Sequence, residues 1–505
     1  MATITVINTN DSGAGSLRQA ILDAKAAGGS STINFDPLLA GDTLKLTSGE
    51  LDITSNITID GGNNNITVDA QGNSRVFDAV HGTSTINGLT ITGGYAGNTR
   101  FDDGGAIQVG TSSGFGGAEL TISNSTITGS NAAYGGGIAI NEGDSLQLTN
   151  STVSGDSALY VGGGIANQGA LTLTNSTVSN DSAGYIGGGI ASAGELTLTN
   201  STLSGNQITA SAGGGLPGYA SSSAGAGLYN IGAAGLYNTT ISNNTGASAG
   251  GGIDNGSDLT LTNVTLADNS ATYGGGLYNA ACGCGDVSMF DSTVTGNEAS
   301  QSGGGIYNAA GSLTLTNSIV AGNGASSQGP DLAGFGTTNY SGVNLFSQSG
   351  IGRPGTDIYV SPSDLSQVFA GTLANNGGAV QTVLITQGGA AEDAGDVGAL
   401  PPDSDDLNNN GNTAEPLPVD ARGDPRVVDG TLDLGAVELQ VPRPVISNPD
   451  NVIAVAGTGP IALDIARQRT ATARRLSSRS IPCRPTAPLN TSTARLSSPR
   501  RPVRC

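Results

Sequence analysis

Short segments of alternating hydrophobic and polar residues recur along most of the chain. Two examples are Leu-Thr-Leu-Thr-Asn-Ser-Thr-Val at 171–178 and Leu-Thr-Leu-Thr-Asn-Ser-Thr-Leu at 196–203. Alternation with a period of two predicts strands whose aliphatic side chains share one face. The asparagine interrupts the alternation. Because asparagine tolerates the left-handed backbone conformation, we expect it to turn the chain between two short strands.

A glycine block ending in Ile or Leu precedes these segments. Within 138–216 and again within 228–306, successive block ends lie 24 to 29 residues apart. A period of this length is typical of a solenoid, in which each coil buries its apolar face only by stacking on its neighbours. The block ends are Ile138, Ile165, Ile190, Leu216, Leu228, Ile253, Leu277 and Ile306.

These patterns together predict an all-β fold, a right-handed three-stranded parallel β-helix. Each coil supplies a Gly-Gly-Ile-x-Asn strand, a Leu-Thr-Leu-Thr strand and a Ser-Thr-Val-Ser strand, and we expect Asn150, Asn175 and Asn200 to stack as an internal amide ladder. The expected parts are a strand and helix cap at 1–50, coils at 51–325, a C-terminal end of the β-helix with an anchor-like module at 326–440 and a disordered tail at 441–505.

A short helix is expected ahead of the coils. Ser16 and Gln19 form a capping box, and we expect the helix that follows to cover the N-terminal end of the solenoid. Its apolar face comprises Leu17, Ala20, Ile21 and Ala24.

The repeats resemble those of bacterial right-handed parallel β-helix surface proteins, including the polymorphic outer membrane protein type. The resemblance covers roughly residues 50–325 and rests on the Gly-Gly-Gly-Ile-Tyr-Asn and Leu-Thr-Leu-Thr-Asn-Ser-Thr coils. Downstream, the motifs at 373–378, 420–426 and 433–438 resemble the C-terminal module called a choice-of-anchor domain. The resemblance implies a non-catalytic scaffold at the bacterial cell surface or outside the cell, adhesin-like or part of a surface layer, that binds glycans or partner proteins.

The charge distribution separates the tail from the rest of the chain. The 505 residues carry a net charge of −21, but all 40 acidic residues lie at or before Asp464, whereas ten arginines and no acid follow it. The tail therefore has the composition of an out-of-frame translation or of a native disordered basic segment. The acidic body argues against nucleic-acid binding. No apolar run approaches the length of a transmembrane helix.

Enzymatic activity is the alternative, because parallel β-helices also carry pectate lyases and other enzymes that cleave extracellular polysaccharides. Such chemistry needs a base, paired carboxylates, or cations that neutralise a uronate. Residues 101–352 contain no Lys, Arg or His, and the adjacent acids Asp102 and Asp103 are also explained by a solvated turn. The sequence therefore favours a scaffold without a catalytic site.

Two sets of residues are candidate binding sites. Tyr229, Tyr278 and Tyr307 each follow the inward Leu or Ile of a glycine block, so alternation predicts that they point outward on one face, where they could stack on sugars, contact a partner protein or shield the strands.

The second set could hold Ca²⁺. It has oxygen-bearing side chains before Gly411, as in the first half of a calcium loop, but position 417 is Leu where a bidentate Glu would complete an EF-hand. An acidic surface turn is the alternative. The candidate ligands are Asp403, Asp405, Asp406, Asn408 and Asn410.

Overall fold

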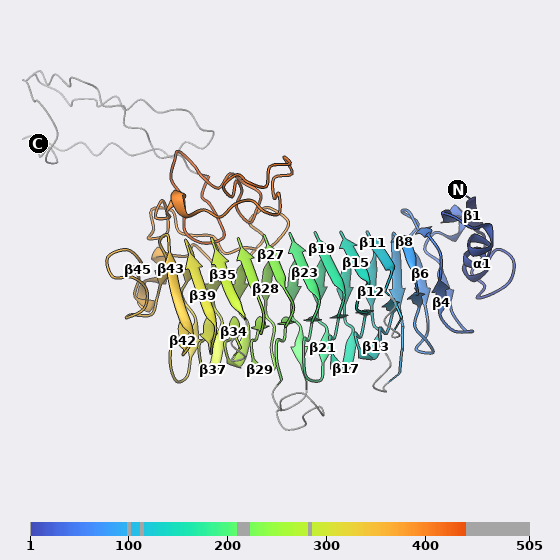
Figure 1. Ribbon diagram of the computed structural model, residues 1–505, viewed down its shortest axis with the longest axis horizontal. Helices are drawn as coiled ribbons and strands as arrows, with labels where there is room; N and C mark the ends of the chain where they lie inside the picture. The colour runs from blue at the N-terminus through green and yellow to red at the C-terminus, as the bar shows by residue number, and fades with distance from the viewer. Residues whose placement is uncertain (1, 98–102, 112–115, 210–222, 281–284, 441–505) are drawn as a thin grey trace, which may run out of the picture. The chain divides into compact units, whose positions relative to one another are not determined.

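The chain folds as a parallel β-solenoid (Figure 1). The computed structural model describes residues 2–97, 103–111, 116–209, 223–280 and 285–440. The described residues from 2 to 440 belong to one compact unit. The predictions for the 441–505 tail, for Asp102 and for the glycine block at Leu216 lie outside the described residues.

Three long parallel sheets form the walls of the solenoid. Sheet A comprises β1 (Ala2–Val6), β2 (Ser31–Phe35), β5 (Ile57–Asp60), β8 (Gly82–Asn87), β11 (Ala118–Ser123), β15 (Ser145–Thr149), β19 (Ala170–Thr174), β23 (Glu195–Thr199), β27 (Ala234–Tyr237), β31 (Leu259–Thr262), β35 (Asp286–Phe290), β39 (Ser312–Thr316) and β43 (Thr337–Ser341). Sheet B comprises β3 (Thr43–Lys45), β6 (Ile66–Asp69), β9 (Leu89–Thr92), β12 (Thr126–Thr128), β16 (Thr152–Ser154), β20 (Thr177–Ser179), β24 (Thr202–Ser204), β28 (Thr240–Ser242), β32 (Thr265–Ala267), β36 (Thr293–Thr295), β40 (Ile319–Val320), β44 (Leu345–Phe346) and β45 (Ile358–Tyr359). Sheet C comprises β4 (Leu51–Ile53), β7 (Phe77–Ala79), β10 (Ile107–Val109), β14 (Ile138–Ile140), β18 (Ile165–Asn167), β22 (Ile190–Ser192), β26 (Leu228–Asn230), β30 (Ile253–Asn255), β34 (Leu277–Asn279), β38 (Ile306–Asn308) and β42 (Leu332–Gly334).

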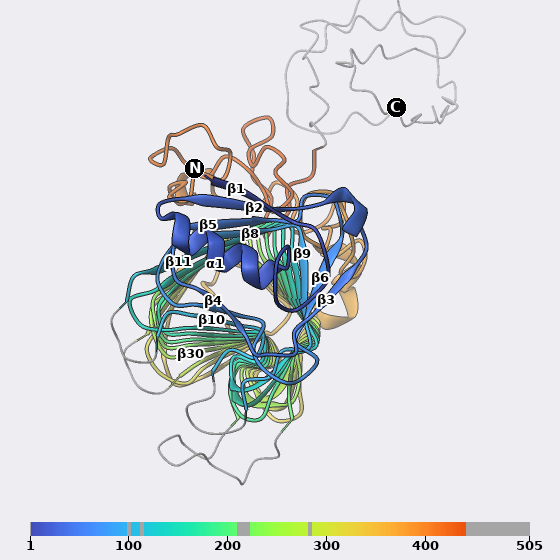
Figure 2. The ribbon, with the colours of Figure 1, turned by 90° about the vertical axis from the view of Figure 1, so that its right-hand side faces the viewer.

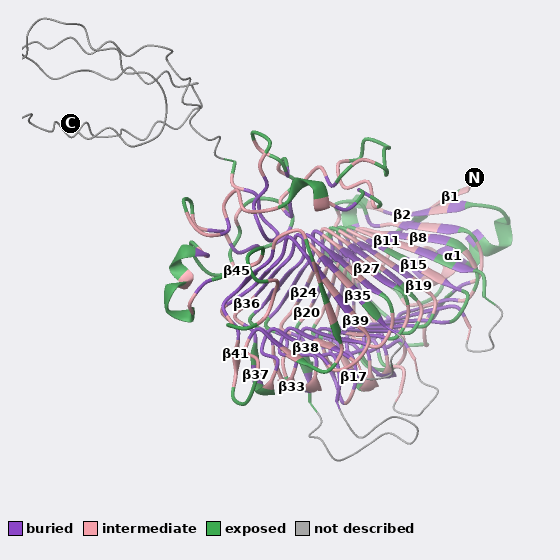
Figure 3. Cartoon of the chain, turned by 60° about the vertical axis from the view of Figure 1, so that its left-hand side comes forward, coloured by how far each residue is buried: buried purple, intermediate pink, exposed green. Residues whose placement is uncertain are grey.

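Buried positions recur along the strands of successive coils (Figure 3), and aliphatic ladders that follow the repeat occupy many of them. Leu146, Leu171 and Leu196 are Cα partners in sheet A, and Ile165 and Ile190 are partners in sheet C. All five side chains are buried. The three-stranded parallel coil expected from the sequence is therefore confirmed.

Two smaller parallel sheets, each of four strands, add a fourth strand to many coils between sheets B and C, which the sequence did not predict. We call these two sheets the lobe (Figure 2). The first comprises β13 (Asn131–Tyr134), β17 (Ser157–Val161), β21 (Ser182–Ala183) and β25 (Gln207–Ile208). The second comprises β29 (Ala247–Ala249), β33 (Ser270–Tyr273), β37 (Glu298–Ser302) and β41 (Gly324–Ala325).

Helix α1 (Leu17–Ala27) covers the N-terminal end of the solenoid, as expected, and packs against β1, β2 and β4 (Figure 2). Ser16 is its N-cap and accepts a hydrogen bond from the amide of Gln19. The Gln19 side chain instead donates to Asp23, so only half of the capping box forms. No helix among the described residues is long and apolar enough to cross a membrane.

The asparagines that turn the chain do not form the expected internal ladder. Asn150 and Asn175 have the expected left-handed φ of 49° and 50°, but both side chains are exposed. The next residue turns inward instead: Ser151 and Ser176 are buried, and the Ser151 amide donates to the Ser176 hydroxyl at 3.1 Å. The prediction of an internal position for these asparagines is therefore wrong, because the corner places their side chains outside the coil.

Asparagine ladders do exist inside the solenoid, at the corner between sheet B and the lobe. Asn206, Asn244 and Asn269 are buried, and each Nδ2 of the first two donates to the Oδ1 of the next residue. Their backbone amides donate to the same oxygens. Two earlier coils have Asp156 and Asp181 at this position.

The segment after the last strand folds back along the corner between sheets A and B (Figure 1). It contains the 3₁₀ helices η2 (Pro362–Gln367) and η3 (Val397–Ala399), whereas η1 (Pro37–Leu39) lies near the N-terminus. The Thr240 hydroxyl donates to the carbonyl of Gln381, and the Asn263 amide donates to the carbonyl of Val419. This segment therefore covers the side of the coils.

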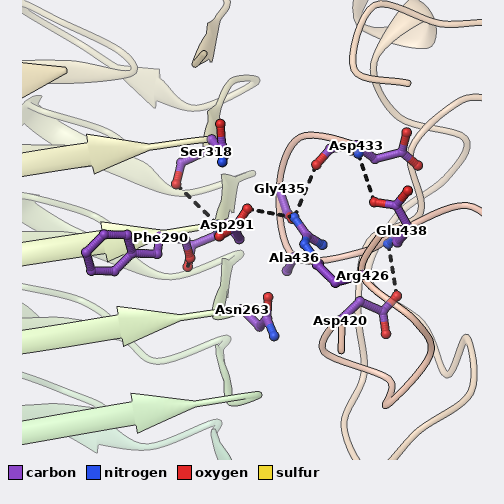
Figure 4. A network of polar contacts seen from close by, with 12 residues as sticks. Asn263, Phe290, Asp291, Ser318, Asp420, Arg426, Asp433, Gly435, Ala436 and Glu438 are labelled. Carbon is purple, nitrogen blue, oxygen red and sulfur yellow. Dashed lines mark hydrogen bonds and ion pairs between the residues drawn. The ribbon is translucent and has the colours of Figure 1, made fainter. Parts of the chain in front are cut away.

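A buried ion pair anchors the returning segment (Figure 4). Arg426 and Asp291 are both fully buried, and Nη2 of Arg426 lies 3.0 Å from Oδ1 of Asp291. Arg422 pairs with Asp420 at 2.9 Å. Arg426 therefore joins the returning segment to the side wall of the coils.

Candidate functional site

One column of side chains runs along the outside of sheet C and contains most of the candidate groups. Each side chain in this column belongs to the middle residue of a three-residue strand whose first residue faces inward. We call this column of side chains the outward column. Its members, in ladder order, are Asp52, Asp78, Gln108, Ala139, Ala166, Ala191, Tyr229, Asp254, Tyr278, Tyr307 and Ala333.

The three tyrosines predicted to face outward all lie in this column. Tyr278 and Tyr307 are direct Cα partners, and Tyr229 is separated from Tyr278 by the strand that carries Asp254. All three side chains are partly exposed. We call Tyr229, Tyr278 and Tyr307 the tyrosine strip.

The rings of the strip are ordered by the spacing of the coils. Tyr278 and Tyr307 stack with ring centroids 5.5 Å apart and an interplanar angle of 2°. Tyr273, from lobe strand β33, meets Tyr307 edge-on with centroids 5.4 Å apart. Side chains of sheet C and of the lobe therefore meet at this face.

A second tyrosine row lies on the earlier coils. Tyr134, Tyr160 and Tyr185 have successive ring centroids 5.6 and 6.3 Å apart. In the same coils, the outward column of sheet C holds buried alanines at 139, 166 and 191. Aromatic side chains thus come from the lobe in the earlier coils and mainly from sheet C in the later ones.

Asp254 interrupts the strip and was not predicted as a site residue. It is only 6% exposed although its position in the strand faces outward. Burial raises the pKa of its carboxyl to about 7. Burial, together with the proximity of Asp254, Tyr307 and Tyr273, also raises the pKa of Tyr278. The strip therefore surrounds an acidic group that has lost most of its contact with water.

A group of three carboxylates lies at the N-terminal end of the outward column. Ligand oxygens of Glu50, Asp52 and Asp78 all lie within 4.8 Å of one another, the only such group of three or more His, Cys, Asp or Glu side chains in the described part of the chain. Nε of Arg75 lies 2.9 Å from Glu50. Burial raises the pKa of Asp78 to about 6, although the charge of Arg75 acts to lower it.

These three side chains are oxygen ligands of the kind that Ca²⁺ prefers. The Oδ1 atom of Asp78 is buried and has no hydrogen-bond partner. The sequence offered one signal for this group: Leu-Asp-Ile at 51–53 and Phe-Asp-Ala at 77–79 are strands one repeat apart. Recognising it required the register of the first coils, where the glycine blocks are absent.

The candidate calcium loop has its side chains in contacts within the protein. The Asp403 carboxylate accepts the amide of Leu407, and the Asp406 carboxylate accepts the amides of Asn410 and Gly411. Asp405 accepts a hydrogen bond from the Thr199 hydroxyl at 2.7 Å, which ties the loop to sheet A.

The amides of the same loop point to a fourth carboxylate. Asn408 and Asn410 both donate to Glu415, at 2.8 and 2.6 Å. Asp403, Asp405 and Asp406 do not form a group of three converging carboxylates like the one at Glu50. Calcium binding by this loop stays a prediction.

The other acidic and basic candidates are dispersed. The backbone carbonyl of Asp103 accepts a hydrogen bond from Arg75, and His81, the one histidine of the sequence, is exposed. Within 101–352 the chain has no basic side chain, so the strip carries no cation of its own.

A comparison with family models agrees with the fold. A family model described as a right handed beta helix region matches residues 136–352. The solved structure of the pectate lyase Pel9A is similar at 14% sequence identity, with a TM-score of 0.41, over 87% of this chain and 96% of that one. A search of curated proteins finds no match.

Proposed function

We propose that this chain is a non-catalytic β-helix scaffold that binds glycans along the tyrosine strip. The observation that carries the proposal is the stacking of Tyr278 on Tyr307 in register on the outside of sheet C. Tyrosine combines an apolar ring with a polar hydroxyl at low conformational cost, which suits it to contacts with sugars. A rigid strip that repeats with each coil matches a ligand that is itself a polymer.

The surroundings of the strip support binding over cleavage of an acidic polysaccharide. A uronate would meet Asp254 and no basic side chain between 101 and 352. Catalysis by β-elimination needs a cation to neutralise the carboxylate and a base to remove a proton. The strip supplies neither a Lys, an Arg nor a His.

We further propose a location at the bacterial cell surface or outside the cell, with an adhesin-like or surface-layer role. The support is the resemblance of the coils and of the motifs at 420–426 and 433–438 to bacterial surface proteins. The returning segment, with Arg426 bound to Asp291, would be the anchor-like module. A partner protein instead of a glycan is the other ligand that the strip would suit.

The test is binding of the whole chain to a glycan panel before and after removal of the strip. The triple variant Y229S/Y278S/Y307S is expected to lose at least about 90% of glycan binding, because each ring provides stacking area that serine lacks. The matched control is Y359S, since Tyr359 is 55% exposed and lies outside the strip. Equal binding by the triple variant and the wild type would exclude this surface.

A second candidate is a polysaccharide lyase or hydrolase, and the carboxylate group at Glu50, Asp52 and Asp78 favours it. Carboxylates on one face could hold Ca²⁺ or act as an acid and base pair. Incubation with uronate polymers, with and without calcium, separates the candidates. Unsaturated products or new reducing ends that disappear in D52N/D78N would establish the enzyme. If no product forms, the proposal of a non-catalytic scaffold stands.

A further inference from the structure

Asp254 is an unusual residue for the outside of a sheet. Its neighbours in the outward column are Tyr229 on one side and Tyr278 on the other. The aspartate side chain is shorter than either tyrosine, so its carboxyl lies at the base of the strip, between larger side chains that remain partly exposed. The carboxyl is thus nine-tenths buried, at a position from which the side chain is directed outward and not into the hydrophobic core.

No cation among the described residues forms an ion pair with this buried acid. None of the ion pairs among the described residues includes Asp254, and 101–352 contains no basic side chain. By contrast, the buried Asp291 is matched by Arg426. Burying a carboxyl without a cation favours its neutral form, and this is why the pKa of Asp254 rises to about 7.

Aromatic rings next to the carboxyl add to its attraction for positive charge. The faces of tyrosine rings carry negative electrostatic potential, so a cation placed against them is stabilised, most strongly where water is excluded. The influence of Asp254 and Tyr307 on the titration of Tyr278 reflects how close these groups lie. A carboxyl among tyrosines is chemically suited to an ammonium group.

We propose that Asp254, with Tyr229 and Tyr278, binds the ammonium group of an amino sugar, so that the strip selects glycans with free amines. This inference rests on the proposed glycan-binding function and names its ligand class. The ammonium would lie between the two rings and pair with the carboxylate, which supplies the charge that 101–352 lacks. A neutral sugar would leave the Asp254 carboxylate unpaired. The negative charge of a uronate would be repelled by the same carboxylate.

The experiment compares two ligands of equal length on the whole chain. Calorimetry at physiological ionic strength measures binding of the glucosamine trisaccharide and of the N-acetylglucosamine trisaccharide. We expect wild-type protein to bind the free amine at least about tenfold more tightly, the effect of one desolvated charge contact. D254N is expected to reduce the ratio to about one, since it removes the charge and keeps the shape.

The control for general electrostatic attraction is D258N. Asp258 is exposed and lies only four residues from Asp254, so this variant makes the same change in net charge outside the strip. It is expected to keep the wild-type preference. Thermal unfolding of both variants checks that each one folds.

The outcomes separate this inference from the proposed function. Equal affinity of wild type for the two trisaccharides, or a preference that survives D254N, overturns the ammonium site. If the acetylated sugar binds and Y278S/Y307S abolishes that binding, glycan binding stands without amine selection. If neither trisaccharide binds, the ammonium site is excluded. The wider glycan panel then tests whether the tyrosine strip binds any other glycan.

Discussion

The backbone amide of Asp156 donates a hydrogen bond to the carboxylate of Asp181 in the next coil, with the amide nitrogen 2.8 Å from Oδ1. Later coils have asparagine at this position, and its second polar atom also bonds: Nδ2 of Asn206 donates to the carbonyl of Val178 at 3.1 Å. The corresponding Oδ2 atoms of Asp156 and Asp181 are buried and have no hydrogen-bond partner. Two coils thus use an acid where the fold prefers an amide.

Replacing these acids is predicted to stabilise the protein at high pH. Burial raises the pKa of Asp156 to about 7, and burial and the charge of Asp156 raise that of Asp181 well above its usual range. A raised folded-state pKa means that stability is greatest below about pH 4 and falls as pH rises toward and through 7. For Asp156 the loss is at most about 4 kcal/mol.

The measurement is urea unfolding of the wild type and D156N/D181N at pH 5 and pH 8.5. The variant should be more stable, with the larger gain at pH 8.5, because amides cannot ionise and can donate as Asn206 does. D258N changes an exposed acid and should shift neither midpoint appreciably. A gain of equal size at both pH values would show that these carboxyls do not titrate in this range.

Loss of Arg426 is predicted to destabilise the chain by about 3–5 kcal/mol, because it leaves buried acids without their cation. The variant R426M should therefore unfold at lower urea, and R426M/D291N should recover part of the loss. In contrast, R353M should cost less than about 1 kcal/mol, since Arg353 is 39% exposed. Similar costs for the two arginines would contradict an anchoring role for the buried pair.

Gly163 is predicted to tolerate no side chain. A Cβ there would overlap the backbone carbonyl oxygens of Gly188 and Ser182 in the next coil. G163A should cost about 3 kcal/mol or prevent folding, because the coils cannot move apart without breaking their ladders. Gly371 has open space around the corresponding position, so G371A should be close to neutral. Thermal unfolding compares the two, and a stable G163A would contradict the tight stacking of the glycine blocks.

Calcium binding is predicted in the millimolar range at the loop that contains Asp403 and Asp406. The ion would have to displace the backbone amides that these carboxylates now accept. Calorimetric titration of the wild type, D403N/D406N and D52N/D78N with calcium locates the binding site. Loss of binding only in the first variant supports the loop, and loss only in the second assigns the ion to sheet C. No heat with wild-type protein excludes both.

The coil itself could be predicted because every level of the sequence agrees with it. Leu171 and Leu173 alternate with threonine, Asn175 supplies the turn, and the same pattern returns one coil later. The lobe was missed because its strands are short and carry no regular alternation. Ile190 pairs directly with Leu228 in sheet C, so the glycine block that ends at Leu228 supplies the next described strand of that ladder.

The burial of single residues and the pairing of residues far apart in the chain were harder to predict from the sequence than the positions of the strands. Alternation placed Tyr278 and Tyr307 correctly on the outer face, but it could not show that the Asp254 between the strands of Tyr229 and Tyr278 is buried. Similarly, the partnership of Arg426 with Asp291 spans 135 residues and follows from how the returning segment docks. Such contacts depend on tertiary packing, for which one sequence carries no local signal.

The tyrosine strip is predicted to bind a glycan. The most direct measurement is a crystal structure of the whole chain with an oligosaccharide from the panel. We predict electron density for the sugar against Tyr278 and Tyr307, extending toward Tyr229 along sheet C. Sugar bound at the carboxylates of Asp52 and Asp78 or elsewhere, with the strip bare, would contradict the claim.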